Sequence, residues 1–233
     1  MAATLLQLKD QISIDAGILG NQNFPNARLT RIINIAQRYV QTQLGGLGYH
    51  KWITSQAITA GLANGAFASA TTNAKKCPID STYFVGLLEF PKSIKFIEIN
   101  DGTNYGVAYE VDEDEFLFHV KNTYLAPSVK EGKFVRLAGY VWLIPSTITA
   151  ATGYYHKTTT DLSADTDTTQ IPLEFEEHLI KRAVAEIDSI NGKLQDKQVT
   201  LNQISKEIED TYRSSFMRLT EDQREKQPKK ALQ

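Results

Sequence analysis

Residues 134–190 read FVRLAGYVWLIPSTITAATGYYHKTTTDLSADTDTTQIPLEFEEHLIKRAVAEIDSI, and the rest of the chain is organised around this segment. Apolar residues recur at near period-two spacing from Val135 to Ile144. This spacing predicts a β-strand, with Gly139 as a bulge or a point of close approach. Residues 148–155 follow as a second strand that can pair with the first in antiparallel fashion.

A polar loop and a helix complete the segment. Residues 158–170 are rich in Asp, Thr and Ser, so we expect a loop that cannot bury itself. Pro172 stands where a helix can begin, because its fixed φ suits a first turn and its missing N–H is not needed there. Glu174, Glu176 and Glu177 then complement the positive end of the helix dipole.

The order of these parts is specific enough to compare with known proteins. A strand reads RLAGYVWLIP at residues 136–145, a second strand ends in two tyrosines, a DLSADTD loop spans residues 161–167, and IPLEFEEHL at residues 171–179 opens the helix. This layout resembles the head-to-tail adaptor proteins of tailed bacteriophages, also called connector or head-completion proteins. The resemblance is close from residue 136 to residue 179 and looser over the N-terminal third.

The resemblance carries expectations about assembly. It implies a helical bundle with a β-rich lobe, and a homo-oligomeric, dodecameric ring around a channel through which double-stranded DNA passes. It also implies a portal protein above the ring and a tail or neck protein below it. In such adaptors a C-terminal helical segment contacts the portal, and by position the contact residues here are Leu201, Ile204, Ile208, Tyr212, Phe216 and Leu219.

Composition sets limits on the class of protein. The chain has 233 residues, 42% of them hydrophobic, which is enough for a proper core, and a formal net charge of -2. This charge does not indicate a DNA-coating protein, although a channel that lets DNA slide is compatible with it. The single cysteine, Cys77, excludes an internal disulfide. We find no membrane-spanning run and no signal peptide at the start, so we expect a protein made in the cytoplasm. The resemblance to phage adaptors implies that it is made in the host cell and located in the virion, at the head–tail junction.

Two helices are expected in the first 48 residues. The apolar spacing predicts a short helix over residues 4–17 and a longer one over residues 26–44. Gln37 and Gln41 lie off the apolar stripe of the second helix. Three arginines also lie off the stripe, and they indicate either a row facing nucleic acid or, as the favoured interpretation, a solvated face or a subunit contact; they are Arg28, Arg31 and Arg38.

The middle of the chain predicts short strands. Residues 53–60 and 93–100 alternate as strands do, and Asp101-Gly102 is a strong turn signal after which residues 105–111 can pair back. Residues 61–72 are expected to form a flexible hairpin loop. The acidic run at residues 112–115 indicates a helix start, with a metal-binding or channel-lining cluster as the alternative.

The C-terminal part predicts a second long helix over residues 196–225. It either forms an antiparallel hairpin with the helix after Pro172 or projects away. Its apolar stripe is narrow, which suits a helix–helix or subunit seam; docking on the chain's own bundle is the equal alternative.

Taken together, the predicted fold class is α+β: terminal helices forming a small helical bundle with a β-rich central insertion and a long C-terminal helix. The predicted domains are a bundle of residues 1–48 and 172–225, an insertion lobe of residues 49–171, and a flexible tail of residues 226–233.

No catalytic residue, cofactor site or metal site is predicted. The four histidines, His50, His119, His156 and His178, fit no metal-ligand spacing. Residues 165–176 fall into an EF-hand-like frame, but Gln170 replaces the required glycine and Pro172 interrupts the loop, so calcium binding is rejected. The alternatives to a head-to-tail adaptor are another neck or tail-completion protein and, less favoured, a phage-encoded polymer hydrolase. No membrane partner is expected.

Overall fold

The computed structural model describes residues 2–67, 73–88, 92–122, 125, 127–193 and 197–225, with side chains as far as Ser215 at the C-terminal end. The chain divides into two compact units. A helical unit holds Met1–Tyr49 and Thr159–Gln233, and a sheet unit holds His50–Thr158. The chain therefore passes between the units twice, once after Tyr49 and once after Thr158.

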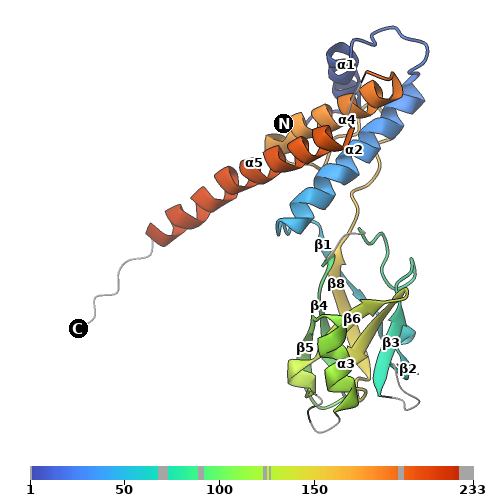
Figure 1. The fold of residues 1–233 in the computed structure, drawn as a ribbon, viewed down its shortest axis with the longest axis vertical. Coiled ribbons are helices and arrows are strands. Elements are labelled where there is room, and N and C mark those ends of the chain that lie inside the picture. The colour runs from blue at the N-terminus through green and yellow to red at the C-terminus, as the bar shows by residue number, and fades with distance from the viewer. Residues whose placement is uncertain are drawn as a thin grey trace. The chain divides into compact units, whose positions relative to one another are not determined.

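The described part of the helical unit contains four α-helices. Their bounds are α1 Leu5–Asp15, α2 Asn26–Gly46, α4 Glu176–Ile190 and α5 Lys197–Glu225, and a 3-10 turn at Leu173–Phe175 leads into α4 (Figure 1). The Thr4 hydroxyl accepts a hydrogen bond from Gln7 N while the Gln7 side chain accepts one from Thr4 N, which closes a capping box at the start of α1. The predicted helices at residues 4–17, 26–44 and 196–225 are thereby confirmed.

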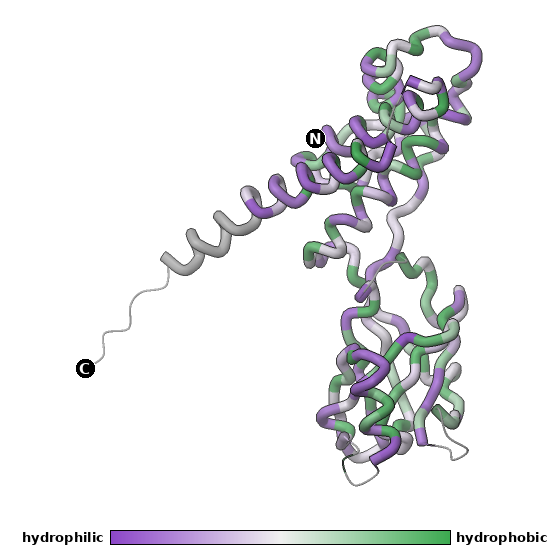
Figure 2. The backbone as a smooth tube through the Cα atoms, viewed as in Figure 1, coloured by the Kyte–Doolittle hydropathy of each residue, from purple (hydrophilic) through white to green (hydrophobic). Residues whose placement is uncertain are grey.

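Helices α4 and α5 run antiparallel. Three contacts fix this direction, because their residue numbers fall along α4 as they rise along α5. Lys197 pairs with Glu186 at 2.9 Å, Glu207 with Lys181 at 2.9 Å, and the Thr211 hydroxyl lies 3.0 Å from His178 Nε2. The helical hairpin, one of two predicted arrangements, is confirmed. Hydrophilic residues dominate much of the described part of α5 (Figure 2), so only a narrow stripe of it is available for packing.

The sheet unit is built on one eight-stranded sheet with the order β1-β8-β4-β5-β6-β7-β3-β2. All neighbouring strands are antiparallel except β5 and β6, which are parallel. A parallel pair needs a crossover, and helix α3 (Glu113–Lys121) provides it. The strands are β1 Ile53–Ala57, β2 Ala63–Gly65, β3 Ala74–Pro78, β4 Ile94–Asn100, β5 Tyr105–Glu110, β6 Lys133–Leu137, β7 Tyr140–Ile144 and β8 Ala150–His156.

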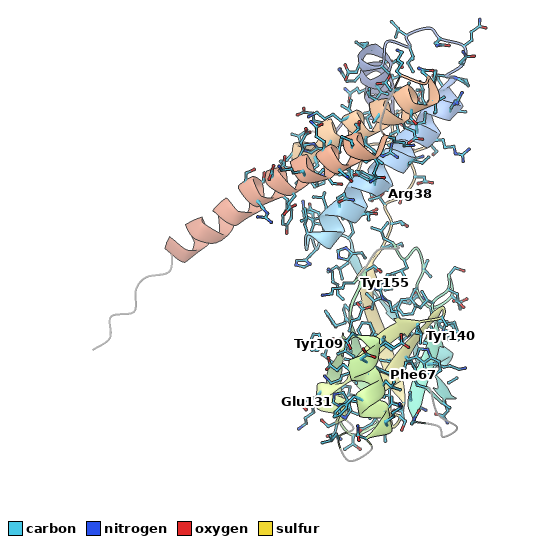
Figure 3. The ribbon with its side chains drawn as sticks, in the orientation of Figure 1. Arg38, Phe67, Tyr109, Glu131, Tyr140 and Tyr155 are labelled. Atoms are coloured by element: carbon cyan, nitrogen blue, oxygen red, sulfur yellow. The ribbon has the colours of Figure 1, made fainter. Side chains whose placement is uncertain are left out.

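The curled sheet encloses its own core. The largest fully buried side chains there are Phe84, Phe134 and Tyr155. The Phe84 ring meets the ring of Tyr155, which is labelled in Figure 3, edge to face at 5.4 Å. A 3-10 turn at Val129–Glu131 lies directly against β5. A Cβ added at Gly106 would lie 1.8 Å from Val129 O, so this close approach requires glycine.

The structure corrects the predicted fold class. The described residues form five α-helices and a curled, mixed eight-stranded sheet, so a small terminal bundle with a β-rich insertion describes the fold only in part. Helices do stand at both ends of the chain, but the fifth, α3, belongs to the sheet unit. The prediction failed because local alternation marks strands without saying which strands pair, and β1–β8 and β3–β7 join distant segments.

The central strands are corrected as well. The predicted single strand from Val135 to Ile144 is the β6–β7 hairpin, whose turn holds Ala138 at φ 52° and Gly139 at φ 78°. Two positive φ angles match a tight hairpin turn, not a bulge. Strand β8 pairs with β1 and β4 instead of with β7. The predicted β4–β5 hairpin at Asp101-Gly102 is confirmed.

Candidate assembly surface

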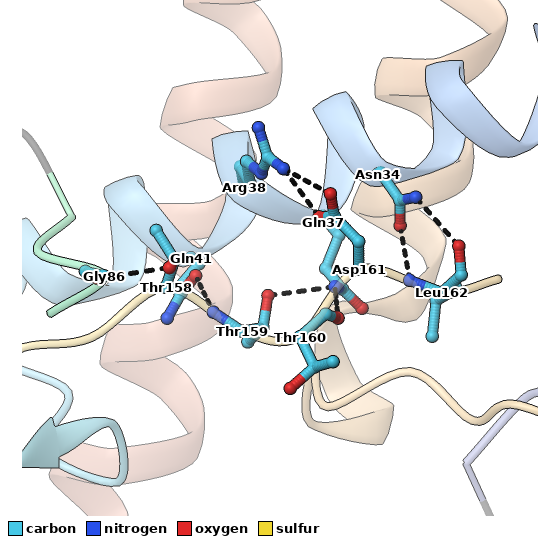
Figure 4. A network of polar contacts seen from close by, with 10 residues as sticks. All are labelled: Asn34, Gln37, Arg38, Gln41, Gly86, Thr158, Thr159, Thr160, Asp161 and Leu162. Atoms are coloured by element: carbon cyan, nitrogen blue, oxygen red, sulfur yellow. Dashed lines mark hydrogen bonds and ion pairs between the residues drawn. The ribbon is translucent and has the colours of Figure 1, made fainter. Parts of the chain in front are cut away.

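Three amide side chains on one face of α2 hold residues 159–171 along the helix, and we call this segment the strap. Asn34 Nδ2 donates to Leu162 O at 3.0 Å, and Leu162 N donates back to Asn34 Oδ1 at 2.9 Å (Figure 4). Gln41 Oε1 accepts from Thr159 N at 3.0 Å. Gln37 donates to the Thr159 hydroxyl at 2.9 Å and to Thr160 O at 3.2 Å.

This contact corrects part of the expectation that the polar loop cannot bury itself, because Leu162 is buried against α2 while most of the loop stays exposed. Gln37 and Gln41 are fully buried, although the periodicity of α2 placed them off its apolar stripe. Thr159 and Thr169 in the strap are buried too. Burial is tolerated because each buried polar group has a hydrogen-bonding partner. The strap belongs to the helical unit, where α2 fixes the path of the chain before α4.

Two of the three predicted surface arginines serve contacts within the chain. Arg38 (Figure 3) pairs with Asp161 of the strap at 2.5 Å, and both side chains are about half exposed. Arg28 donates to Asn23 O at 2.8 Å, and its guanidinium lies over the Phe24 ring. The contacts at Arg28 and Arg38 therefore favour a structural role over a nucleic-acid-binding row.

The acidic run at residues 112–115 begins a helix, as predicted. Asp112 Oδ1 accepts from Glu115 N at 2.7 Å and so caps α3. Glu115 in turn pairs with Lys133 at 2.6 Å. Within the described residues, no group of three or more His, Cys, Asp or Glu side chains could hold a metal ion.

The carboxylates of the EF-hand-like frame are engaged elsewhere. Asp165 pairs with Lys9 at 2.7 Å. Asp167 accepts backbone hydrogen bonds from Ser163 N and Ala164 N at 2.7 Å and 2.8 Å, and these bonds lower the pKa of Asp167. Both residues therefore shape the strap within the helical unit.

The single thiol and the buried histidines do not resemble activated catalytic groups. Cys77 is fully buried, and burial raises the pKa of its thiol to about 12, so it carries no thiolate at neutral pH. Burial, followed by the nearby charges of Lys95 and His50, lowers the pKa of His156 to about 4. His178 lies between α4 and α5 beside Thr211, and burial also lowers its pKa. These groups are held in their uncharged forms at neutral pH.

The predicted interface stripe on α5 divides into two parts. Ile204 and Ile208 are buried in the helical unit, while Leu201 and Tyr212 are partly buried. The side chains of Phe216 and Leu219 lie outside the described residues. Tyr39 of α2 secures the first part of the helix by donating to Leu201 O at 2.9 Å. The first half of α5 is therefore anchored on the chain's own helices.

The second half of α5 continues past its partner helix. Thr211 contacts His178, and α4 begins only two residues before His178, at Glu176. Since the two helices are antiparallel, residues 213–225 extend beyond the start of α4 for about 20 Å (Figure 1). This part of the helix backbone therefore has no α4 backbone beside it.

The sheet unit carries an exposed aromatic face. Tyr105 is 78% exposed and Tyr109 is 62% exposed. Both lie on β5, where Figure 3 labels Tyr109, and because they are four residues apart they share one face of the strand. On the neighbouring strands the rings of Phe96 and Tyr154 stack at 4.5 Å. Exposed aromatic side chains gathered on one sheet are typical of a protein-binding surface.

The sequence comparisons agree with these assembly features. Residues 3–229 match the family model described as SU10 adaptor protein. No curated protein matches the chain. In the described residues, no helix is both long enough and apolar enough to cross a membrane.

Proposed function

Because the chain belongs to the SU10 adaptor protein family, a family of phage head-to-tail adaptors, we propose that it forms a ring that joins the portal to the tail or neck and lines the DNA channel. Membership of this family makes the chain a structural component of the virion, and the resemblance in residues 136–179 that first indicated an adaptor is confirmed. The observation that carries the proposal is a family match over residues 3–229, nearly the whole chain. The ring is dodecameric in this proposal, as in the adaptors that the sequence resembles.

The portal contact in this proposal lies on α5. Its predicted stripe runs from Leu201 to Leu219, but the burial of Ile204 and Ile208 commits the first part to the helical unit. The part beyond Tyr212 extends past α4, and it carries Phe216 and Leu219 at the same helical spacing. We therefore place the portal contact at Phe216 and Leu219, with Ile204 and Ile208 as its anchor.

The tail or neck contact lies on the sheet unit. Tyr105 and Tyr109 supply large apolar surfaces with polar tips, which protein interfaces favour. These exposed rings also argue against lining the channel with this face, because a DNA passage gains nothing from a row of aromatic contacts. The net charge of -2 suits a channel wall that DNA slides past.

Binding to the portal tests the proposal. Purified protein is mixed with the portal complex of the same phage, and bound copies are counted by native mass spectrometry and seen by electron microscopy. We expect a closed ring on one end of the portal. Phe216→Asp should abolish this binding while the circular dichroism spectrum and melting temperature stay unchanged. A wild-type protein that leaves the portal bare at micromolar concentration refutes the proposal.

A further inference from the structure

A shallow groove with a volume of about 380 Å³ lies between α4 and α5, next to the last residue of α1. Ile180 and Val184 of α4 and Ile204 of α5 line its apolar part. The first two of these side chains are partly exposed, so the groove offers apolar surface that the helical unit itself leaves uncovered. A segment with one aliphatic side chain matches this space.

The groove is also acidic. Three carboxylates line it, from Asp15, Asp188 and Glu207, against a single ammonium group from Lys181. Lys181 is shared between Glu207 at 2.9 Å and Glu177 at 3.0 Å. Among the described residues, neither Asp15 nor Asp188 forms an ion pair. An occupant that brings positive charge as well as an aliphatic side chain therefore fits the groove best.

The C-terminal segment of this chain has that chemistry. Residues 226–233 read KQPKKALQ, with three lysines, no acidic side chain and Leu232 as the only large apolar residue. Leu232 can enter the apolar part of the groove while Lys229 and Lys230 meet the carboxylates at its rim. Pro228 disfavours a continuous helix and prepares the segment to bind in an extended form.

The reach of this segment decides whether the same chain or a neighbouring copy supplies it. Helix α5 ends at Glu225, 21 residues after Ile204, and this length of helix spans about 31 Å. The seven residues from 226 to 232 reach at most about 25 Å when fully extended. Leu232 could come within about 6 Å of Ile204 of its own chain, Cα to Cα, only if the segment reversed direction at Glu225 without a turn and then ran back along α5 fully extended. A neighbouring subunit in a ring has no such restriction.

From these observations we propose that the α4–α5 groove binds residues 226–233 of a neighbouring copy of this chain, so that each subunit of the ring holds the C-terminal segment of the next. The inference rests on the ring of the proposed function and names a contact that closes it. It is compatible with a portal contact at Phe216 and Leu219, because the C-terminal segment begins after those residues.

A peptide titration tests recognition without requiring a ring. A fluorescent peptide of sequence KQPKKALQ is titrated with the full-length protein at low and at physiological salt. We expect saturable binding that weakens at least tenfold in Asp188→Lys and is unchanged in Asp210→Lys, which carries the same charge change at an exposed position of α5 outside the groove. Absence of binding, or equal binding by both variants, overturns the assignment of the groove.

Cross-linking tests whether the segment comes from another copy. Leu232→Cys is combined with Val184→Cys in the full chain, rings are assembled on portal, and disulfides are formed by mild oxidation. We expect a ladder of covalent oligomers, and none when Leu232→Cys is combined with Ala27→Cys on α2, which is exposed and outside the groove. The native Cys77 is buried, so we expect it to form no disulfide in this experiment.

The outcomes separate the inference from the proposed function. Rings that form without the ladder, or a cross-link confined to single chains, overturn the exchange between copies while the ring survives. If electron microscopy finds no rings on portal, the proposed function itself fails and the exchange fails with it. The peptide titration still decides in that case whether the groove recognises the segment.

Discussion

The Thr169 hydroxyl donates a hydrogen bond to Gln37 Oε1 at 2.9 Å, and 132 positions of sequence separate the two residues. Both side chains are buried. Between them the chain leaves α2, completes the whole sheet unit and returns. This bond, together with those from Asn34 and Gln41, fixes the strap on α2 and so fixes where α4 begins relative to α2.

Removal of the Gln37 amide should therefore be costly. Gln37→Ala breaks three hydrogen bonds and removes the Gln37 partner of the buried Thr159 and Thr169 hydroxyls. We therefore expect a loss of about 2–4 kcal/mol in the free energy of unfolding. Urea titration followed by circular dichroism measures it. Gln43→Ala, the same change at a partly exposed position of α2, is the control and should cost less than about 1 kcal/mol. Equal losses in the two variants would show that the strap contributes little.

The two ends of the α5 stripe should respond differently to the same substitution. Ile208→Asp places a charge at a fully buried position, so we expect the helical unit to lose about 3–5 kcal/mol and portal binding to fail through unfolding. Phe216→Asp should leave thermal stability within about 1 °C of wild type and still abolish portal binding. If Phe216→Asp binds portal normally, the portal contact does not lie at the far end of α5.

A glycine in β5 should tolerate no side chain. The Cβ of Gly106→Ala would overlap Val129 O of the adjacent 3-10 turn, and the three nearest atoms all belong to the backbone of Val129 and Lys130, so no flexible side chain can move to make room. We expect the sheet unit to lose more than about 3 kcal/mol, read as a lower melting temperature in calorimetry. Gly46→Ala is the matched control, since its Cβ meets nothing within 4 Å, and it should be neutral or slightly stabilising. A Gly106→Ala protein that melts like wild type would contradict the close approach.

Stability should fall in mild acid partly through His156. Its pKa is lowered in the folded chain to about 4 from an ordinary value of 6.5, so the unfolded chain binds more protons between these values. Stability contributed by neutral His156 is complete above about pH 6.5 and is lost as the pH falls toward 4, by about 3 kcal/mol in all. Urea titrations at pH 7.5, 5.5 and 4.5 measure this loss. His156→Gln should show a shallower decline, and an identical decline in both proteins would assign the acid sensitivity to other groups.

Helices and local turns could be predicted from the sequence because their signals lie within a few residues. The stripe of α5, the caps of α1 and α3 and the Asp101-Gly102 turn are all local. Strand pairing could not be predicted in the same way. The parallel contact of β5 with β6 involves only two residue pairs, Tyr109 with Lys133 and Glu110 with Phe134, and it depends on the intervening α3.

The candidate surface was predictable only in part for a similar reason. The stripe on α5 was visible, but the burial of Ile204 and Ile208 depends on α4, whose distance and direction periodicity does not report. The strap was missed because Asp, Thr and Ser residues suggested a solvated loop. Asn34, Gln37 and Gln41 did carry a signal for the strap. Amide side chains at three- and four-residue steps beside an apolar stripe can form hydrogen bonds with the polar groups of a second chain segment.

The central claim is that this chain joins phage heads to tails, and electron microscopy of particles made without its gene tests it most directly. We predict DNA-filled or leaking heads that lack tails, with tail assembly restored when the wild-type gene is supplied from a plasmid. Particles with complete tails and a normal DNA content would contradict the account.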